Sequence, residues 1–551
     1  MLLRTLLTGI LLTAGAFAQV SSFPKPSYFR ETFQKTRTSV ELKDPVKLRD
    51  FVTDGKLELS LKHYLELVMA NNTDIQIQFL TVEIPKNNIQ AAMGVWDPTT
   101  TTRFSTTRAT SLPTSPLDAN NVNAILKSLT QPYSLSYQQT LDTGTNYLAT
   151  FSGAKSSSSG SRSSYLKQLT ANLAVQVNQP LLRNRGRFVN RIPMMTAQSN
   201  LRVSEYNLRD RLLTLVQLAE GLYWNVISAR ETLRVQEKAR ETAKTYLDFM
   251  QQQLDLGALS PLDIYNPKAA LAQAEVALSQ AKFNLISAED LLRHQLGVDL
   301  DPELRKLPLE LTEPVDPGPS DTMSMDREET VQKALVNSPA LKASTQRLDV
   351  DDLQIHAAKN GLLPNLTFNA GYTSNGLGGI FDPNKSSLLS SGATLLPVIP
   401  GGIADALGQM FGFNYPTYSA GLTLQLPIRS RTASANMANA VIQKKSDSLT
   451  VRNTQQNIRL QVLGALTALE GAKEQLKLAN IQRDFAKLNQ DAAEEKYKLG
   501  TETNQNVVFA QQAMAQADLT VVSAQIGLRR NLLNLMTQTG ELLDDRGIVV
   551  K

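Results

Sequence analysis

Two distant stretches of this 551-residue sequence follow one pattern. Residues 254–263 and 497–506 each place a glycine, Gly257 or Gly500, shortly before an alanine-rich segment. The two glycines are 243 residues apart (500 − 257). Small residues downstream keep this spacing, because Ala270, Ala274 and Ala281 correspond to Ala513, Ala517 and Ala524. A duplication on this scale predicts two similar halves, each of about 200 residues or more.

Residues 1–18 show the three-part pattern of a secretory signal. Arg4 is the single early cation, an apolar stretch covers residues 5–17, and Ala16 and Ala18 form a small-residue cleavage pattern. We expect this segment to be removed on export; a buried N-terminal strand is the alternative. Residues 19–56 follow as a polar, proline-containing extension. The sequence has no cysteine, which excludes disulfides and thiolate metal sites.

The composition favours a folded chain without a reactive centre. Apolar residues make up 42% of the sequence, and the net charge of +5 is spread rather than clustered, which argues against nucleic acid as a partner. The histidines His63, His294 and His356 fall on separate helical patterns without metal-ligand spacing. The glycines of residues 376–379 lack the helix and the lysine that phosphate binding needs. We therefore predict no catalytic residue, no metal and no cofactor, and the chain is not expected to be an enzyme.

Each half passes through the same patterns in the same order: a helical segment, then strands, then very long helices. The first repeat is expected over residues 57–300 and the second over residues 329–540. A proline-rich, acidic linker over residues 301–328 joins them, and residues 541–551 form a C-terminal tail. The chain is therefore predicted to be one unit built twice.

The strands are expected at about 98–179 and 364–427, where apolar and polar residues alternate. In the first repeat, one set of positions carries Leu169, Ala171, Leu173, Val175 and Val177, and the other carries Gln168, Thr170, Asn172, Gln176 and Asn178. The alternation fits a sandwich strand with a core face and a wet face, or a barrel strand between lipid and a water-filled lumen. Residues 373–415 hold apolar runs between strands, and they fit either a folded cap or a surface patch.

Helical hairpins are expected at about 190–297 and 430–540, with tips at Gly257 and Gly500. No proline occurs from Met194 to Leu256, so a helix there would extend roughly 95 Å and would need a partner along its length. A glycine can take the left-handed conformation that ends many helices. Ser260, and Thr501 or Thr503, are candidate caps for the returning helices. A stripe of small residues with heptad spacing provides a packing surface, as in an ordinary antiparallel coiled coil: Ala270, Ala274, Ala277, Ala281 and Ala288.

Basic residues gather where strands give way to helices. They are Arg183, Arg185, Arg187 and Arg191 in the first repeat, and Arg429 and Arg431 in the second. A solvated helix start is one explanation, although a first turn usually prefers acidic residues. Anchoring at the membrane interface is the other, because cations interact with the phosphates of lipid headgroups.

The order of these patterns resembles the TolC family of outer membrane efflux proteins over about residues 57–540. The most specific points are Ala-Leu-Val-Asn-Ser-Pro-Ala-Leu at residues 334–341, Gln179-Pro180, and Tyr497 to Gly500 followed by an alanine-bearing helix. The resemblance implies an α+β membrane protein. In it, four strands from each chain of a homotrimer close a twelve-stranded transmembrane β-barrel, which a periplasmic α-helical barrel continues. It therefore favours barrel strands over sandwich strands.

The first repeat is longer than the second. Pro180 lies 109 residues after Asn71, whereas Pro427 lies 90 residues after Asn337. The additional residues fall around residues 133–153, where apolar and polar positions also alternate. They predict either longer strands or an added hairpin.

The resemblance further implies a passive exit duct for efflux or secretion, in the outer membrane of a Gram-negative bacterium and extending into the periplasm. Its implied partners are outer membrane lipid, a periplasmic adaptor protein, and an inner-membrane transporter that supplies the energy. Carried over by position, the adaptor-facing tip residues are Gly257, Ala258, Leu259, Ser260, Gly500, Thr501, Glu502 and Thr503.

The candidate pore-gate residues are Asp263 in the first tip and Asn506 in the second. Asp263 occupies an acidic position of the family, whereas Asn506 stands where a carboxylate is usual, so we expect only a weak preference for cations. The competing function is structural: a trimeric coiled-coil adhesin, or a periplasmic spacer, anchored in the outer membrane. Such an adhesin would place its strands in one C-terminal block, and the strands inside both repeats weigh against it.

Overall fold

The computed structural model describes residues 52–53, 56–112, 125–159, 165–257, 260–297, 307–315, 318, 326–381 and 401–548. Residues 51–551 form one compact unit. The predicted signal at residues 1–18 and the tip residues Ala258 and Leu259 lie outside the described residues. No helix among the described residues is both long enough and apolar enough to cross a membrane.

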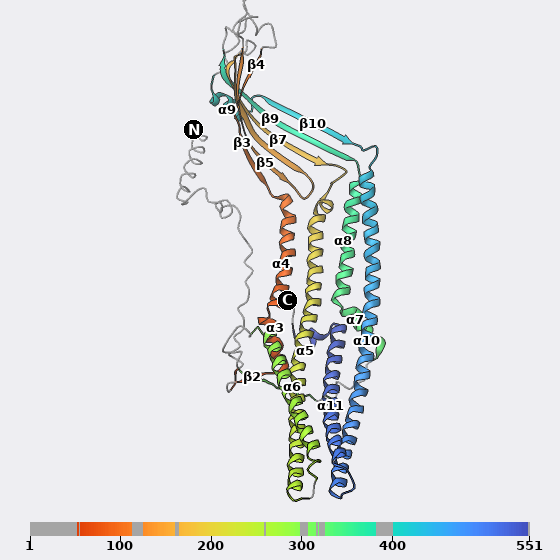
Figure 1. Cartoon of the computed structure of the whole chain (residues 1–551). Coiled ribbons are helices and arrows are strands. Elements are labelled where there is room, and N and C mark those ends of the chain that lie inside the picture. The colour runs from red at the N-terminus through yellow and green to blue at the C-terminus, as the bar shows by residue number, and fades with distance from the viewer. Residues whose placement is uncertain are drawn as a thin grey trace, which may run out of the picture. The chain divides into compact units, whose positions relative to one another are not determined.

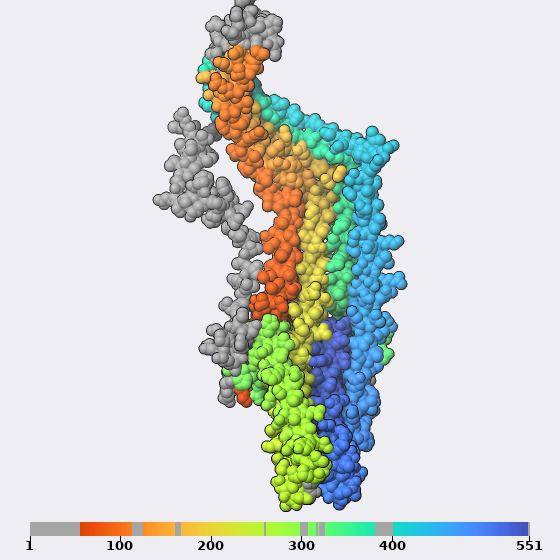
Figure 2. All heavy atoms as spheres, in the orientation of Figure 1, coloured from red at the N-terminus to blue at the C-terminus, as the bar shows by residue number. Residues whose placement is uncertain are grey.

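Helices dominate both repeats and follow the same order in each (Figure 1). The short helices are α3 (Leu61–Asn71), α4 (Thr73–Met93), α7 (Arg327–Asn337) and α8 (Pro339–Gly361). The hairpins are α5 (Arg187–Asp255) with α6 (Tyr265–Gln295), and α10 (Arg431–Lys498) with α11 (Asn504–Thr539). The side chains of Asn72 and Ser338 cap α4 and α8 at equivalent places in the two repeats. Figure 2 shows the two hairpins, in green and blue, side by side down to their tips.

The helix α5 begins earlier than the sequence predicts. It has 69 residues and includes Pro193, whereas the proline-free stretch begins at Met194. A proline in the second turn of a helix removes one hydrogen bond near the helix end, where the cost is smaller than in the middle. The helix would extend roughly 100 Å at 1.5 Å per residue.

Seven strands form one antiparallel sheet in the order β10-β9-β7-β6-β5-β3, with β4 also paired to β5. Their bounds are β3 (Thr99–Phe104), β4 (Thr107–Ser111), β5 (Leu126–Thr140), β6 (Asn146–Ser158), β7 (Tyr165–Pro180), β9 (Asn365–Phe381) and β10 (Pro416–Gln425). Because β3 and β4 pair with successive parts of β5, they share one position in the sheet. The described sheet therefore has six strand positions rather than the four that the family resemblance implied, and the additional residues of the first repeat form an added hairpin.

The strand register sorts the side chains onto two different faces. Leu173 lies opposite Phe151 on one side and Ser374 on the other, and Phe151 lies opposite Leu135. This apolar face continues through Val175, Val177, Phe368, Tyr372, Leu422 and Leu424. The opposite, polar face carries hydroxyls and amides, among them Ser134, Ser152, Asn172, Thr367, Asn369 and Thr423. The seven strands contain no Asp or Glu.

A short helix, α9 (Ile403–Phe411), covers part of the apolar face (Figure 1). Its Ala406 and Met410 are buried against Ala171 of β7. The Ser374 hydroxyl donates a hydrogen bond to the Met410 carbonyl at 2.6 Å. A Cβ at Gly376 would lie only 1.9 Å from the carbonyl oxygen of Ala406, so only glycine allows this approach. The described part of this apolar segment is thus a helix packed on the sheet face, which corresponds to the folded cap of the two expected alternatives.

A second, small sheet joins the start of the first repeat to the linker. In it β2 (Lys56–Leu59) pairs with β1 (Val52–Thr53) and, in parallel, with β8 (Leu309–Leu311). Leu57 and Leu59 are buried, and the Tyr223 hydroxyl of α5 donates to the Leu59 carbonyl at 3.0 Å. Part of the linker is therefore a structural element that rests against the middle of α5.

Candidate functional site: the hairpin tips and the groove between them

Each hairpin ends in a glycine with a left-handed backbone, as the sequence predicts. The φ angle is 74° at Gly257 and 76° at Gly500. A Cβ at either position would meet no atom within 4 Å. The need for glycine here comes from the backbone conformation and not from crowding.

The two returning helices start differently. Thr503 caps α11, because its hydroxyl accepts a hydrogen bond from the Asn506 N–H at 3.4 Å. The corresponding prediction for Ser260 is wrong: α6 begins five residues later, at Tyr265, and Ile264 precedes it without a side-chain cap. The Ser260 hydroxyl instead accepts from the Leu262 N–H at 3.4 Å, inside the turn between the helices.

The two tips are tied to each other through Asn504, which the sequence did not single out. The Asn504 side-chain amide donates to the backbone carbonyl of Asp263 at 2.9 Å. Its carbonyl oxygen accepts from the Tyr246 hydroxyl at 2.8 Å. Burial, followed by the nearby Tyr497 and Glu494, raises the pKa of Tyr246, so the phenol keeps the proton that it donates. One asparagine therefore links α11 to α5 and to the turn between α5 and α6.

The two candidate gate residues, Asp263 and Asn506, are both exposed and belong to different tips. The Asn506 side chain donates to the Glu502 carboxylate at 2.5 Å, within the second tip. This hydrogen bond is the largest of the effects that lower the pKa of Glu502. Asp263 uses its backbone carbonyl, not its carboxylate, to contact the second tip. Its carboxylate remains exposed and helps burial to raise the pKa of Tyr497.

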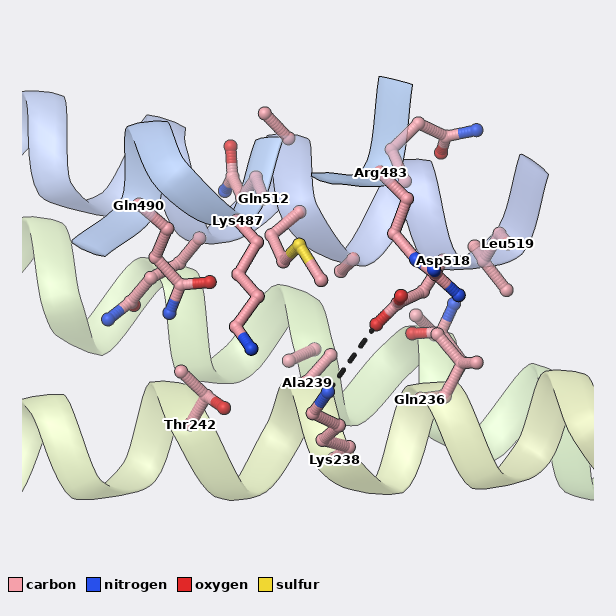
Figure 3. Close-up of a pocket in the computed structure, with 18 of the residues that line it drawn as sticks. Gln236, Lys238, Ala239, Thr242, Arg483, Lys487, Gln490, Gln512, Asp518 and Leu519 are labelled. Carbon is pink, nitrogen blue, oxygen red and sulfur yellow. Dashed lines mark ion pairs between the residues drawn. The ribbon is translucent and has the colours of Figure 1, made fainter. Parts of the chain in front are cut away.

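A polar groove of about 1310 Å³ runs between the hairpins above the tips (Figure 3). Residues of α5, α6, α10 and α11 line it. Alanines of the predicted stripe contribute to the lining, including Ala270, Ala274 and Ala277. Small residues at these positions keep the groove open rather than filled, so the stripe serves a surface as well as helix packing.

Charges of both signs line the groove. Lys238 of α5 faces Asp518 of α11 at 3.6 Å, and Gln512 of α11 donates to Gln273 of α6 at 3.2 Å. Figure 3 shows Lys487 reaching from the blue hairpin toward the yellow-green one. The groove offers many hydrogen-bonding groups and more polar than apolar surface, which suits a hydrated protein contact better than a small apolar ligand. Among the described residues, no group of three His, Cys, Asp or Glu could hold a metal ion.

The predicted membrane-interface arginines divide into two groups. Arg183, Arg429 and Arg431 line one hollow of about 940 Å³ where the sheet meets the helices, although they come from different repeats. Arg187 lies 3.6 Å from Asp142, and Arg191 pairs with the same carboxylate. Asp142 belongs to the turn of the added hairpin, so these two arginines hold that turn against the start of α5. Arg185 is exposed.

Comparison with known proteins agrees with this arrangement. The family model "Outer membrane efflux protein" matches residues 145–298 and 330–541. The probable efflux pump outer membrane protein TtgC of Pseudomonas putida is 24% identical over 343 residues, which cover 60% of this chain and 62% of TtgC. The outer membrane protein TolC of Escherichia coli is 24% identical over 329 residues, with 60% and 62% covered. The outer membrane channel CmeC of Campylobacter jejuni has a TM-score of 0.58 at 16% identity, covering 93% of this chain and 90% of CmeC.

The fold is thus that of the outer membrane channels, with paired helical hairpins below an antiparallel sheet. The family match spans more than half of the sequence, and the chain belongs to the outer membrane efflux protein family. The predicted family and outer membrane location are confirmed. The chain spans 62% of the length of TtgC and of TolC.

Proposed function

We propose that this chain is the passive exit duct of an efflux pump or a secretion path. The single observation that carries the proposal is the division of the sheet into two faces. One face is apolar and rich in aromatic residues, and the other is lined by uncharged hydroxyls and amides. That division is typical of a membrane wall with lipid on one side and water on the other.

Closure of the wall requires further copies of the chain. The two outer strands of the sheet, β3 and β10, are exposed along their whole length and have no neighbour on their outer sides among the described strands. Six antiparallel positions make these two edges run in opposite directions. The β10 edge of one copy can therefore pair with the β3 edge of the next, and a rotation closes the ring. Three copies, as in the family, give eighteen positions (3 × 6) instead of the expected twelve.

The two repeats supply the rest of the duct. Two hairpins per chain give six per trimer, which continue the wall as a helical barrel in the periplasm. The tips at Gly257 and Gly500 form its inner mouth, with Asp263 and Asn506 beside it. Arg183, Arg429 and Arg431 lie at the periplasmic surface of the outer membrane, where they face lipid phosphates.

The periplasmic partner binds this duct at the hairpin tips. A periplasmic adaptor docks on the tips and in the groove that Lys238, Lys487 and Asp518 line, because both signs of charge are available there for a protein surface. The name of TtgC, a probable efflux pump outer membrane protein, supports a role in a pump. An inner-membrane transporter supplies the energy.

Single-cysteine labelling tests the assignment of the two faces, because the chain has no cysteine of its own. Leu422 and Thr423 are neighbours in β10 and stand on opposite faces. In reconstituted vesicles, a spin label at Thr423→Cys should collide with a water-soluble relaxing agent. A label at Leu422→Cys should collide with oxygen dissolved in lipid. Equal exposure of both labels to water would rule out the membrane wall.

A further inference from the structure

Four cations stand on the apolar face of the sheet. They lie in the part of the sheet near β4, which Figure 1 shows at the end away from the hairpins. Lys155 of β6 pairs with Leu169 and Gln131, and Lys167 of β7 pairs with Ile380. Nearer to the β3 edge of the sheet, and on the same face, Arg108 of β4 pairs with Leu129. Lys127 of β5 precedes Leu129 by two residues, so it points to the same face. We call Arg108, Lys127, Lys155 and Lys167 the outer cation band.

The band occupies a place where charges are unexpected. All four side chains are exposed, on the same face as the apolar side chains of Phe151 and Leu173. The seven strands contain no carboxylate that could pair with them. In the described connections from β3 to β7 and from β9 to β10, the carboxylates are Asp142, which lies at the opposite end, and Asp405, which stands in the first turn of α9. Among the described residues, the outer end of this face therefore carries more positive than negative charge.

The aromatic residues beside the band place it at the edge of the apolar layer. Phe104, Tyr133 and Phe151 lie on the same face, nearer to the hairpins than most of the band. Membrane sheets carry aromatic girdles where hydrocarbon meets headgroups, and lysine and arginine reach past such girdles to the headgroups. Lys167 and Gln179 are twelve residues apart (179 − 167), so the stretch between them, roughly 40 Å at 3.3 Å per residue, is long enough for a tilted strand to cross the hydrocarbon layer.

We propose that the outer cation band binds the phosphate groups of outer-leaflet lipids. The inference rests on the proposed assignment of the apolar face to lipid. A free phosphate ion would be a weak ligand there, because four exposed cations spread over four strands build no enclosed pocket. A lipid brings apolar chains that lie at the same time against the exposed Phe104 and Leu135 of this face. The site therefore selects a phosphorylated lipid by its headgroup and its chains together.

Binding of lipid A to the purified full-length protein in detergent tests the proposal. The ligands are a fluorescent diphosphorylated lipid A and the same lipid after removal of both phosphates. The variants are Arg108→Gln, Lys155→Gln and Lys167→Gln, alone and combined. The matched control is Arg103→Gln in β3, which pairs with Ser134 and stands on the polar face of the same sheet.

The wild type should prefer the phosphorylated lipid, and each substitution in the band should weaken binding about fivefold. The triple variant should lose on the order of a hundredfold, while Arg103→Gln should bind like the wild type. The single variants carry the test if the triple variant fails to fold. Unchanged binding by the band variants, no preference for phosphates, or release of the lipid by millimolar inorganic phosphate would each overturn the proposal.

The labels at Leu422 and Thr423 do not depend on these cations. Failure of the labelling test would remove the lipid-facing assignment and the proposed function with it. Unchanged lipid binding by the triple variant, with the labels as expected, would remove only the phosphate site.

Discussion

The Arg546 guanidinium donates two hydrogen bonds to the buried Glu220 carboxylate. Nη2 lies 2.8 Å from Oε1, and Nε lies 3.0 Å from Oε2. Glu220 is only 1% exposed, in the middle of α5, and its carboxylate also accepts from the Trp224 indole at 3.3 Å. Arg546 follows α12 (Leu542–Asp545), whose two leucines are buried. The C-terminal tail expected from the sequence is thus a docked segment that neutralises a charge inside the helical region.

Breaking this pair on one side should destabilise the protein strongly. Arg546→Met leaves Glu220 buried without its counter-charge, which costs about 3–5 kcal/mol. The double variant Glu220→Leu with Arg546→Met removes both charges and should recover most of that loss. Guanidinium unfolding followed by helical circular dichroism measures both. A single variant as stable as the wild type would show that the pair contributes little.

A buried carboxylate between α8 and α10 predicts a pH dependence. Asp351 is 3% exposed, and its Oδ2 is buried without a hydrogen-bond donor among the described residues. Burial and the neighbouring Asp447 raise the pKa of Asp351 from 3.8 to about 6, with Asp352 adding to the shift and Lys444 opposing it. Because the folded-state pKa is the higher one, folding favours the protonated acid. That stability is complete below the unfolded pKa and is lost as the pH rises through about 6.

Asp351→Asn should therefore stabilise the protein at neutral pH by about 2–3 kcal/mol, since each pKa unit corresponds to about 1.4 kcal/mol. The gain should shrink toward zero near pH 4. Asp349→Asn, an exposed position on the same helix, is the control and should show no such trend. Unfolding free energies of both variants, measured between pH 4 and pH 8, test this prediction. A gain in stability that does not vary with pH would contradict a raised pKa of Asp351 in the folded state.

The glycine under α9 should hold that helix in place. In Gly376→Val the new side chain overlaps the Ala406 carbonyl, and overpacking of this kind costs about 1–3 kcal/mol. We expect α9 to leave the sheet while the strands stay paired. Gly421→Val in β10 meets no atom within 4 Å and serves as the control. Chymotrypsin should cut near Phe411 faster in the first variant only; equal cleavage in both would mean that the contact is not what holds α9.

Asn504 should keep the two tips together. Asn504→Ala removes hydrogen bonds to Asp263 and Tyr246, each worth about 1 kcal/mol. The tips should then separate more often, which raises the conductance of the reconstituted channel. Asn506→Ala breaks a bond within its own tip and should have a smaller effect. Single-channel recording compares the two, and a larger effect of Asn506→Ala would contradict the bridge.

The sequence predicts the features that depend on local patterns. The positions of Gly257 and Gly500 and the alternation in β7 and β10 are encoded within a few neighbouring residues. The approximate length of the helices follows from long stretches without proline. The added hairpin was one of two outcomes that the alternation around residues 133–153 allowed. Strand number remained open because pairing depends on register, which the pattern of a single strand does not fix.

The features that the sequence did not predict depend on contacts between distant residues. Asn504 and Asp263 are 241 residues apart, and Glu220 and Arg546 are 326 apart. The packing of α9 on the sheet depends on the close approach of the Ala406 carbonyl to Gly376. Neither end of such a contact has a special signature of its own. The order of the chain brings them together only after the helices and the sheet have formed.

The proposed function of this chain is that of a passive exit duct for an efflux pump or a secretion path. Its most direct test is the rate at which cells, loaded with a fluorescent pump substrate and then re-energised, release it. Cells that keep the adaptor and the transporter but lack this chain should retain the dye, and restoring the chain should restore release. Release at the same rate with and without the chain would contradict the claim.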